Sequence, residues 1–358
     1  MADIIRSTRD YEAWLRRHLR RELVVKDLGI KHKKMCESPF AFLRATYWRW
    51  AETVLDVCPE AATAAKVLAV GDIHLENFGT WRDADGRLVW GVNDFDEAAE
   101  MPYALDLIRL ATSAILAGKS AALAGNFCTA ILRGYDKGIA APRPIVLDRD
   151  HVWLREQVAV SDKKRDKFWK KIDKSTWTKA PAAYRAALTA AMPERLVAFK
   201  TARRSAGVGS LGRPRWIGVA EWRGAPVVRE AKAVLPSSWL RASGERGTRI
   251  RCGEIANRRY RAPDPWYHLS KTILVRRLSA NNRKIEADDD PAVLLSAEML
   301  ELMGFDLACA HLGGANRPGA IKRDLAHRKG AWLQELAERM VASVEKDSAA
   351  WAAAHECS

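Results

Sequence analysis

The chain has 358 residues, a formal net charge of +15 and a hydrophobic content of 48%. This length is enough for two lobes with separate cores, and the hydrophobic content excludes an intrinsically disordered protein. No apolar run is as long as a membrane span, and the N-terminal residues lack the apolar core of a signal peptide. The positive charge favours anionic partners such as nucleotides, nucleic acids, acidic lipids or phosphorylated compounds, without distinguishing between them.

The cysteines are scattered along the chain without a C-x-x-C pair or a metal-ligand spacing. Disulfides are rare in the cytoplasm, so this scatter predicts a cytoplasmic protein with reduced thiols. The cysteines are Cys36, Cys58, Cys128, Cys252, Cys309 and Cys357.

Two amphipathic helices are predicted near the N-terminus. In residues 8–25, large apolar side chains recur at helical spacing with arginines between them, so we expect a packing helix with a solvated basic face. A second helix is predicted to begin at Ser38 and Pro39, a capping residue followed by proline at the first helical position. Arg44 lies off the apolar stripe of this second helix.

The most informative stretch begins at residue 66. Residues 66–70 are an apolar run that predicts a buried strand, and it is followed by Gly71-Asp72-Ile73-His74-Leu75-Glu76-Asn77-Phe78-Gly79. A turn signal at residues 83–86 predicts a hairpin between the segments on either side of it. This hairpin would bring Asp94 back beside Asn77, so that the side chains of Asp72, Asn77 and Asp94 converge on one small volume.

Such a convergence of oxygen ligands has a chemical consequence. Carboxylates about three to five ångströms apart repel each other and resist ionising together. A hard divalent cation removes this problem, and a ligand set of oxygens alone suits Mg²⁺. Phosphoryl transfer uses the same set: one carboxylate takes the hydroxyl proton, and a carboxylate with an amide holds metal on the phosphates.

The pattern G-D-x-H-x-x-N, followed by a short hairpin and D-F, resembles a known pair of segments. These are the catalytic loop and the metal-binding segment of the aminoglycoside phosphotransferase and choline kinase branch of the protein-kinase-like superfamily. The resemblance implies that Asp72 is the catalytic base, that Asn77 and Asp94 hold the metal, and that His74 supports the loop from inside it. Asp96 is a further candidate metal ligand, with an ordinary turn cap as the alternative.

More closely, the chain resembles a bacterial family known as domain of unknown function 2252. Its features include GDxHxxNFG, NDFDE and a later GVGSxG, which stand here at residues 71–79, 93–97 and 207–212. An arginine in a similar phenylalanine-rich segment of that family implies that Arg44 faces the site, and a surface arginine is the alternative. In the small-molecule kinases an aspartate that matches Asp106 supports the catalytic loop by hydrogen bonds, whereas the alternative for Asp106 is dipole complementarity at a helix N-terminus.

A rival interpretation is a dinuclear phosphoesterase, because those enzymes also have G-D-x-H after a strand. They need further Asp, Asn and His ligands downstream, typically in a G-N-H-[DE] segment. The sequence contains no such segment, so we set this class aside.

Residues 144–205 are predicted to form a basic helical connection. Within it, the segment 163–174 combines lysines with aromatic residues, a pattern that could grip a phosphate backbone while Trp169 or Trp177 stacks on a base. The alternative is a solvated helix whose aromatic side chains pack inward. Nucleic acid is therefore kept as a partner to test, although it is not favoured.

A second motif, G-x-G-x-x-G, precedes two predicted strands, Arg215 to Trp222 and Pro226 to Val234. Residues 202–205 before the motif are polar, so we expect no buried strand there, and a dinucleotide-binding fold is disfavoured. A glycine-rich loop followed by a hairpin whose second strand carries a cation matches the order of a kinase small lobe. The residues expected to approach phosphate through the backbone are Gly207, Gly209, Ser210 and Gly212.

Two cations compete for the phosphates. Lys232 and Arg229 lie on opposite faces of the predicted strand, so only one of them can reach the site. Lys232 is favoured because lysine is the more usual residue here, although the resembled family often has Lys-Glu-Ala in place of Arg229-Glu230-Ala231. In kinases this lysine pairs with a glutamate on the next helix, which implies Glu254, with Glu245 in reserve.

The remaining chain is predicted to complete the small lobe and return to the large one. A strand is expected at residues 272–278, a hinge at 281–282, and two long helices at 294–311 and 329–354. His311 is interpreted as a satisfied core histidine. Because the glycine-rich loop follows the catalytic loop, the order of an ordinary kinase is inverted. We expect a circular permutation, which is feasible where chain ends lie close together, and the alternative is that one of the two motif matches is accidental.

Together these features predict an α+β, two-lobed, protein-kinase-like fold that is circularly permuted. Residues 1–143 would carry the large-lobe helices with the catalytic and metal-binding loops, 144–205 the connection, 206–285 the small lobe, and 286–358 the helices that return to the large lobe. The predicted function is ATP- and Mg²⁺-dependent phosphoryl transfer to a hydroxyl of an unidentified small-molecule or protein acceptor. The alternatives are nucleotidyl transfer, an inactive nucleotide-binding regulator and a basic nucleic-acid-binding protein.

Overall fold

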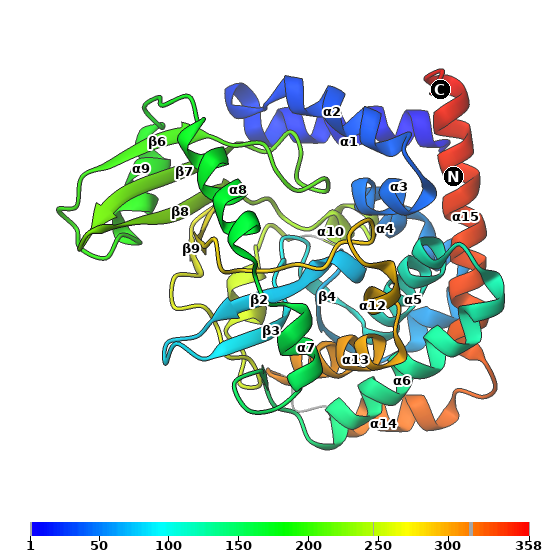
Figure 1. Cartoon of the computed structure of the whole chain (residues 1–358). Helices are drawn as coiled ribbons and strands as arrows, with labels where there is room; N and C mark the ends of the chain where they lie inside the picture. Colours follow the sequence, from blue (N-terminus) through cyan, green and yellow to red (C-terminus); the bar gives the residue numbers. More distant parts are fainter. Residues whose placement is uncertain (1, 246, 315–317, 358) are drawn as a thin grey trace.

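The computed structural model describes residues 2–245, 247–314 and 318–357. The chain is a mixed α+β protein, and within these residues its strands form three antiparallel sheets accompanied by helices (Figure 1). A five-stranded sheet lies at one end of the molecule and most of the long helices lie at the other (Figure 1). Across the described ranges, no helix combines the length and apolar character that a bilayer crossing requires.

The first four helices are α1 (Ile4–Leu19), α2 (Val25–Met35), α3 (Pro39–Ala45) and α4 (Tyr47–Val57). The apolar stripe predicted for the first helix is buried, but α1 ends at Leu19, where Arg20 leaves the helical region with a φ of 49°. As predicted, Ser38 caps α3 by accepting a hydrogen bond from the backbone N–H of Ala41 at 3.1 Å, and Pro39 occupies the first position.

The helical body consists of α5 (Tyr103–Gly118), α6 (Ala124–Ala140), α13 (Ala297–Leu312) and α15 (Trp332–Ala354). Helix α13 packs against α6, and α15 packs against α5. Glycines allow the first of these pairs to approach closely. A Cβ on Gly134 would lie 1.8 Å from the carbonyl oxygen of Glu301, and one on Gly304 would lie 2.1 Å from that of Ile131. The C-terminal helices therefore pack on helices from the first half of the chain.

The five-stranded sheet has the order β6-β7-β8-β10-β9. Its strands are β6 (Phe199–Arg203), β7 (Arg215–Trp222), β8 (Ala225–Ala233), β9 (His268–Ser270) and β10 (Ile273–Leu278). Strands β7, β8 and β10 match the predicted ones. Strand β6 is a correction, because a strand with buried residues does precede the glycine-rich loop: Thr201 and Ala202 are buried, and Ala202 packs in a cluster with Ile217.

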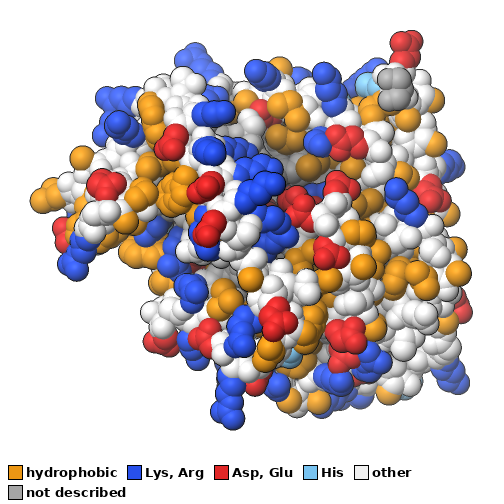
Figure 2. Space-filling view, in the orientation of Figure 1, with side chains coloured by type: hydrophobic (Ala, Val, Ile, Leu, Met, Phe, Trp, Pro, Cys, Tyr) orange, Lys and Arg blue, Asp and Glu red, His pale blue; other side chains and the backbone are white. Residues whose placement is uncertain are grey.

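Helix α8 (Asp162–Asp173) crosses the five-stranded sheet (Figure 1). Its Phe168, Trp169 and Ile172 pack in one apolar cluster with residues of the sheet. This packing agrees with the second interpretation of segment 163–174, a basic helix with a solvated face whose aromatic side chains point inward. Figure 2 shows Lys and Arg side chains gathered on this face of the molecule, beside α8.

Two smaller sheets support the central loops. Strand β1 (Lys66–Ala69) pairs with β4 (Ala99–Pro102), and β2 (Phe78–Arg82) pairs with β3 (Leu88–Val92), which also holds β5 (Ile145–Val146). The β2-β3 pair is the predicted hairpin, with Phe78 opposite Val92. Shorter helices are α7 (Val152–Gln157), α9 (Ala182–Ala190), α10 (Ser238–Ala242), α11 (Cys252–Ala256), α12 (Pro291–Leu294) and α14 (Pro318–His327).

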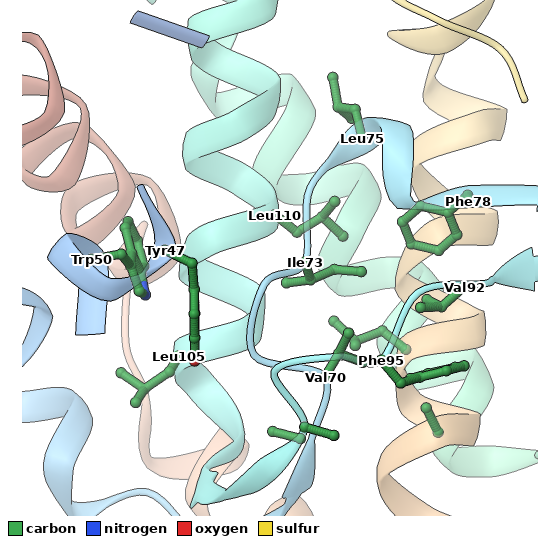
Figure 3. Packing of buried hydrophobic residues seen from close by; sticks show 14 of the residues in the cluster. Tyr47, Trp50, Val70, Ile73, Leu75, Phe78, Val92, Phe95, Leu105 and Leu110 are labelled. Carbon is green, nitrogen blue, oxygen red and sulfur yellow. The ribbon is translucent and has the colours of Figure 1, made fainter. Parts of the chain in front are cut away.

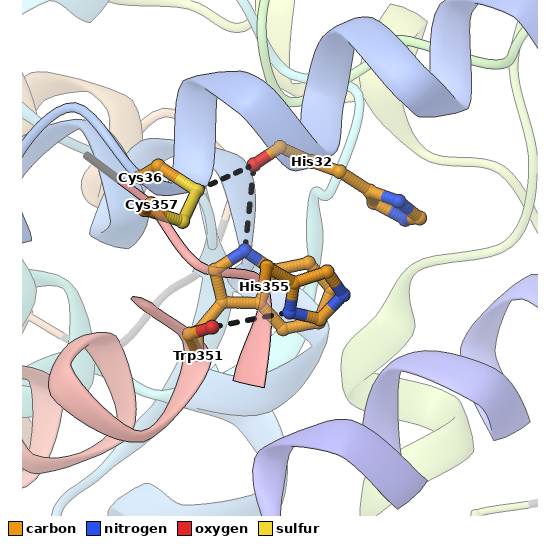
Figure 4. Close-up of a disulfide and its surroundings, with 5 residues drawn as sticks. All are labelled: His32, Cys36, Trp351, His355 and Cys357. Carbon is orange, nitrogen blue, oxygen red and sulfur yellow. Dashed lines mark hydrogen bonds between the residues drawn. A yellow bond between two sulfur atoms is a disulfide. The ribbon is translucent and has the colours of Figure 1, made fainter. Parts of the chain in front are cut away.

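A disulfide joins Cys36, at the end of α2, to Cys357, just after α15 (Figure 4). Trp351 and His355 stack beside it, with ring centroids 3.7 Å apart. The expectation that all the thiols are reduced is therefore wrong for this pair. The two Cα atoms lie 5.7 Å apart across a sequence separation of 321 residues, a proximity that no local spacing indicates. The free cysteines, all buried, are Cys58, Cys128, Cys252 and Cys309.

Candidate active site

The loop that follows β1 is anchored by helix α5. The backbone N–H groups of Val70 and Gly71 donate to the two oxygens of Asp106, at 2.7 and 2.9 Å. His311 Nε2 lies 3.0 Å from the same buried carboxylate, and its Nδ1 lies 2.8 Å from the hydroxyl of Tyr135. Asp106 therefore holds the loop by hydrogen bonds, as the resemblance implied, and His311 is a buried histidine with a partner at each ring nitrogen.

The underside of this loop is apolar. Ile73 and Leu75 are buried, and Ile73 points toward Leu110 of α5 (Figure 3). Gly71 has a φ of 82°, and a Cβ there would lie 2.4 Å from the carbonyl oxygen of Glu97, so only glycine fits this position. The apolar side chains of the loop pack in the core, and its polar side chains line the pocket on the other side.

Asp72 lies beside a buried arginine that the sequence analysis did not single out. Arg109 donates from Nη2 to Asp72 and to the carbonyl oxygen of Leu43. Its guanidinium also lies 5.0 Å from the ring centroids of both Tyr47 and Trp50. Burial raises the pKa of Asp72 to about 6, although Arg109 opposes the shift. A carboxylate that titrates near this pH is suited to accept a proton at neutral pH.

Asn77 and Asp94 are brought together by the β2-β3 hairpin. The backbone N–H of Asn93 donates to the carbonyl oxygen of Asn77 at 3.0 Å, which holds the segment with Asp94 beside the loop. Asn77 Nδ2 donates to the carbonyl oxygen of Asp72, so Oδ1 is the side-chain atom left for another partner. The three side chains expected to converge therefore line one pocket: Asp72, Asn77 and Asp94.

Lys232 of β8 lies between two carboxylates. Its Nζ is 3.2 Å from Asp94 Oδ1 and 2.7 Å from Asp96 Oδ1. Burial raises the pKa of Asp94, but the cations Lys232 and Arg276 outweigh it, so the net shift is downward. Burial and the neighbouring Asp94 raise the pKa of Asp96. Asp96 Oδ2 has no hydrogen-bond donor in the described part of the chain. A cation therefore already occupies the place between the two candidate metal ligands.

Arg229 and Glu254 do not contribute to this pocket. The position of Arg229 agrees with the choice of Lys232 as the favoured cation, whereas the expectation for Glu254 is corrected. Arg229 lies on the other face of β8, where its Nε donates to the carbonyl oxygen of Ala191 at 2.8 Å. Strand alternation separates it from Lys232, so of the two competing cations only the lysine reaches the carboxylates. Glu254 on α11 pairs with Arg251 at 2.7 Å, and this local ion pair replaces the expected pair with Lys232.

The glycine-rich loop connects β6 to β7 and lies directly over Asp72. A Cβ added to Gly209 would lie 3.0 Å from Asp72 Oδ2, so a side chain at this position would touch the carboxylate. Gly207 and Gly212 have φ values of 76° and 95°, which favour glycine. Gly207, Gly209 and Ser210 line the pocket.

The far end of the loop is held from outside the pocket. The carbonyl oxygen of Gly212 accepts a hydrogen bond from the N–H of Val24 at 3.0 Å, and a Cβ on Gly212 would lie 2.7 Å from Leu28 of α2. Ser210 Oγ accepts a hydrogen bond from Arg215 Nη2 at 2.7 Å. Gly212 therefore anchors the loop and does not itself line the pocket.

His74 and Arg44 line the same pocket. Burial and the nearby Arg44 lower the pKa of His74 well below its usual value, so the imidazole is neutral, and its Nδ1 accepts a hydrogen bond from the N–H of Glu76 at 3.2 Å. Arg44 pairs with Glu76 at 2.6 Å. Arg44 therefore faces the site, and His74 shapes the turn of the loop.

Three further cations at the pocket were not identified from the sequence. Arg213 pairs with Glu97 at 2.7 Å, and Lys284 Nζ lies 3.4 Å from the carbonyl oxygen of Glu76. Burial lowers the pKa of Lys284 to about 8. Lys31 of α2 donates to a carbonyl oxygen of the glycine-rich loop.

Some of these residues carried a sequence signal. Lys31 stands on the apolar side of its helix, at helical spacing from Leu28 and Met35, and Arg109 is a charged residue in an otherwise apolar stretch. A charged residue inside an apolar stripe predicts a buried partner. Arg213 and Lys284 lie in irregular segments, where no periodicity could have revealed them.

The pocket has a volume of about 700 Å³, which includes its opening to solvent. A second pocket of about 500 Å³ lies on the other side of Asp94, because Asn93 and Phe95 line it together with Trp81 and Tyr267. Among the residues that the structure describes, no three His, Cys, Asp or Glu side chains form a group that could hold a metal ion by themselves.

The comparison with curated proteins found no match to this chain, and the comparison with solved structures found none. A family model described as "Uncharacterized protein conserved in bacteria (DUF2252)" matches residues 23–141. The matched segment runs from the start of α2 to the end of α6 and stops before the glycine-rich loop. The chain is therefore similar to this bacterial family over the part that carries Asp72, Asn77 and Asp94.

Proposed function

We propose that this protein is an ATP- and Mg²⁺-dependent phosphotransferase with a two-lobed, circularly permuted, protein-kinase-like fold. The observation that carries the proposal is the meeting of segments that are far apart in the sequence. Asp72, Asn77 and Asp94 share one pocket with the glycine-rich loop 207–212, and Lys232 lies beside Asp94. Phosphoryl transfer uses this combination of a proton acceptor, metal ligands, a phosphate-covering loop and a lysine.

The five-stranded sheet supports the kinase-like interpretation. The glycine-rich loop connects its first two strands in sequence, β6 and β7, and Lys232 lies on the third, β8. A glycine-rich loop over the phosphates and a lysine on the third strand are features of the small lobe of protein kinases. Glu254 departs from that pattern, because it does not pair with Lys232.

The position of the chain ends supports the permutation. Arg49 donates from Nη1 to the carbonyl oxygen of Ala2 at 2.9 Å and pairs with Asp347 of α15 at 2.6 Å. The N-terminus therefore lies beside the last helix, and Figure 1 draws both ends there. Two chain ends in one place can be joined and reopened elsewhere without disturbing the core.

The side chains in the pocket fit a Mg²⁺ ion that is bound together with phosphates. Among the described residues, Asn77 donates from its amide nitrogen and its Oδ1 accepts no hydrogen bond, and Asp96 Oδ2 is buried without a donor. Mg²⁺ commonly binds through one or two carboxylates and completes its shell with water and phosphate oxygens. Asn77 and Asp94 would hold the ion, with Asp96 as a further ligand, and the bound ion would neutralise charge on the phosphates.

In the proposed reaction, Asp72 accepts the proton of the acceptor hydroxyl. The hydroxyl oxygen forms a bond to the γ-phosphorus of ATP, the bond from that phosphorus to the β–γ bridging oxygen breaks, and ADP leaves. Arg109 orients the carboxylate of Asp72. Backbone N–H groups of the glycine-rich loop and the ammonium of Lys232 supply positive potential for the phosphate oxygens.

The second pocket supports a nucleotide as the phosphoryl donor. Aromatic side chains line it, namely Trp81, Phe95 and Tyr267, and aromatic rings are suited to pack against a base. Asn93 lines it too, and its Oδ1 is buried without a donor in the described ranges. An amino group of a base would satisfy that oxygen. A base in this pocket would direct its phosphates toward Asp94.

One observation favours a second candidate, an inactive nucleotide-binding regulator. Lys232 pairs with Asp94 and Asp96, and Glu254 pairs with Arg251, so the Lys–Glu pair that protein kinases need for phosphoryl transfer is not formed between Lys232 and Glu254. The two candidates differ in turnover, since a regulator would bind Mg²⁺ and ATP without transferring phosphate to any acceptor.

Thermal unfolding with and without ATP and Mg²⁺ tests the proposal. A ligand at about a hundredfold its dissociation constant stabilises a protein by roughly 2.7 kcal/mol, which raises Tm by several degrees. We expect a Mg²⁺-dependent shift in the wild type that is lost in Asp94→Asn and kept in Asp85→Asn, a change at an exposed turn carboxylate. The proposal fails if nucleoside triphosphates give no shift, or if Asp94→Asn responds like the wild type.

A further inference from the structure

One wall of the main pocket is built by elements that the phosphotransferase motifs do not include. Tyr11 of α1, Trp48 of α4 and Arg213 before β7 line it, and the Tyr11 and Trp48 rings stack with centroids 4.1 Å apart. Lys31 of α2 borders this wall, because its Nζ lies 5.5 Å from the Tyr11 ring centroid and 4.8 Å from that of Trp48.

Lys31 is a buried ammonium group without a carboxylate partner. It is 2% exposed, and no ion pair within the described ranges includes it. Its only hydrogen bond in that part of the chain is to the carbonyl oxygen of Gly209, at 2.8 Å. Buried charges are normally paired, because removing an ion from water is strongly unfavourable. Burial accordingly lowers the pKa of Lys31 to about 7.

The same wall has more donors than acceptors. Arg213 Nε and Trp48 Nε1 are buried without an acceptor among the described residues. The carboxylate of Glu97, which also lines the pocket, already accepts from Arg213 at 2.7 Å and from the N–H of Ser238 at 2.6 Å. A ligand that complements this wall must therefore bring acceptor oxygens. A negatively charged ligand would also pair with the unpaired ammonium of Lys31.

Gly209 joins this wall to the candidate base. Its carbonyl oxygen binds Lys31, and its Cα side faces Asp72, where a Cβ would lie 3.0 Å from Oδ2. The backbone of Gly209 therefore lies between the unpaired ammonium of Lys31 and the carboxylate of Asp72. A small molecule that carries both an anionic group and a hydroxyl could span the same gap once the loop rises to cover the phosphates.

We propose that this wall, formed by Tyr11, Lys31, Trp48 and Arg213, binds the phosphoryl acceptor, and that the acceptor is a small hydroxy compound with an anionic group. Its anionic oxygens replace the carbonyl of Gly209 on Lys31, and its hydroxyl lies at Asp72. The identity of the acceptor rests on the proposed phosphotransferase function, whereas binding of the anion does not.

Isothermal titration in the absence of nucleotide tests the binding. The probes are two hydroxycarboxylates (glycerate and gluconate), two phosphate monoesters (glycerol 3-phosphate and glucose 6-phosphate), the uncharged glycerol and glucose, and the cation choline. We expect at least one anionic class to bind, and the comparison of carboxylates with phosphate esters shows which anion the wall prefers. Choline and the uncharged compounds should bind at least about tenfold more weakly.

Variants at Lys31 assign the binding to this wall. Lys31→Met and Lys31→Gln should weaken anion binding at least about tenfold, whereas Lys33→Met, at an exposed lysine of the same helix, should leave it unchanged. A cooperative thermal unfolding transition in the Lys31 variants, measured without ligand, shows that they are folded. The inference is overturned if no anion binds, if neutral compounds or choline bind equally well, or if Lys31 variants bind like the wild type.

The two proposals fail separately. Asp94→Asn should lose the Mg²⁺·ATP response and keep anion binding, because Asp94 pairs with Lys232 and is not one of the residues that form the proposed anion-binding wall. Anion binding without any nucleotide response would remove the phosphotransferase function and leave the anion site. A nucleotide response without anion binding would remove the anion site and leave the phosphotransferase function.

Discussion

The backbone of Gly209 lies against the carboxylate of Asp72, so that a Cβ added to the glycine would stand 3.0 Å from Oδ2. This contact joins the glycine-rich loop, between β6 and β7 of the five-stranded sheet, to the loop that follows β1. The two motifs that stand separately in the sequence therefore meet at one carboxylate. Any side chain at residue 209 changes the distance between the glycine-rich loop and the carboxylate of Asp72.

We expect Gly209→Val to lower the rate of phosphoryl transfer by at least about tenfold, because catalysis is sensitive to small displacements of reacting groups. The new Cβ would lie 3.0 Å from Asp72 Oδ2 and 3.4 Å from the carbonyl oxygen of Arg44, so the loop must shift. Gly29→Ala is the control, since nothing lies within 4 Å of its Cβ. Steady-state kinetics of both variants check this expectation, and a wild-type kcat/KM in Gly209→Val would contradict it.

The raised pKa of Asp72 predicts how activity depends on pH. Burial moves this pKa from 3.8 to about 6, so the carboxylate becomes the ionised base only as the pH rises through about 6. We expect kcat/KM to rise over this range. Asp72→Asn should lower kcat by roughly 10²–10⁴-fold and abolish the rise. A profile that stays flat between pH 5 and pH 7 in the wild type would contradict the assignment of Asp72 as the base.

The same pKa also predicts a stability difference. Between about pH 4 and pH 6 the folded protein retains a proton on Asp72 that the unfolded chain has lost. The free energy of unfolding therefore falls as the pH rises through this window. Asp72→Asn has no such titration, so the variant should gain stability relative to the wild type from pH 4 to pH 6. Urea unfolding of both proteins at several pH values measures this difference, and a constant difference would speak against the shift.

The local part of the site could be predicted from the sequence. A short apolar strand, a polar loop and a turn signal are all read within one stretch, and the hairpin that they predicted places Phe78 opposite Val92. Strand alternation separated Lys232 from Arg229, but alternation alone does not show which face is turned toward the carboxylates. That choice depends on how the sheet packs, and here Lys232 faces Asp96.

The non-local part could not be predicted, because it depends on how distant segments pack. Lys31 reaches Gly209 across 178 residues, and Cys36 meets Cys357 across 321. Neither spacing carries a periodic signal. Glu254 shows the opposite error. The resemblance to kinases implied that it pairs with Lys232, but nearby arginines pair with its carboxylate.

We expect Lys232→Met to lower the free energy of unfolding by about 3 kcal/mol, because it removes the cation that is paired with both Asp94 and Asp96. Lys200→Met, at an exposed position of β6, should change stability little. Lys232 contributes to the lowered pKa of Asp94, and stability from a lowered carboxyl pKa is present above pH 4 and lost as the pH falls. The difference between wild type and variant should therefore shrink on acidification, and Mg²⁺ should restore part of the stability at neutral pH. Urea unfolding at pH 7 and at about pH 3, with and without Mg²⁺, measures both effects, and a loss independent of pH and Mg²⁺ would contradict this account of the pair.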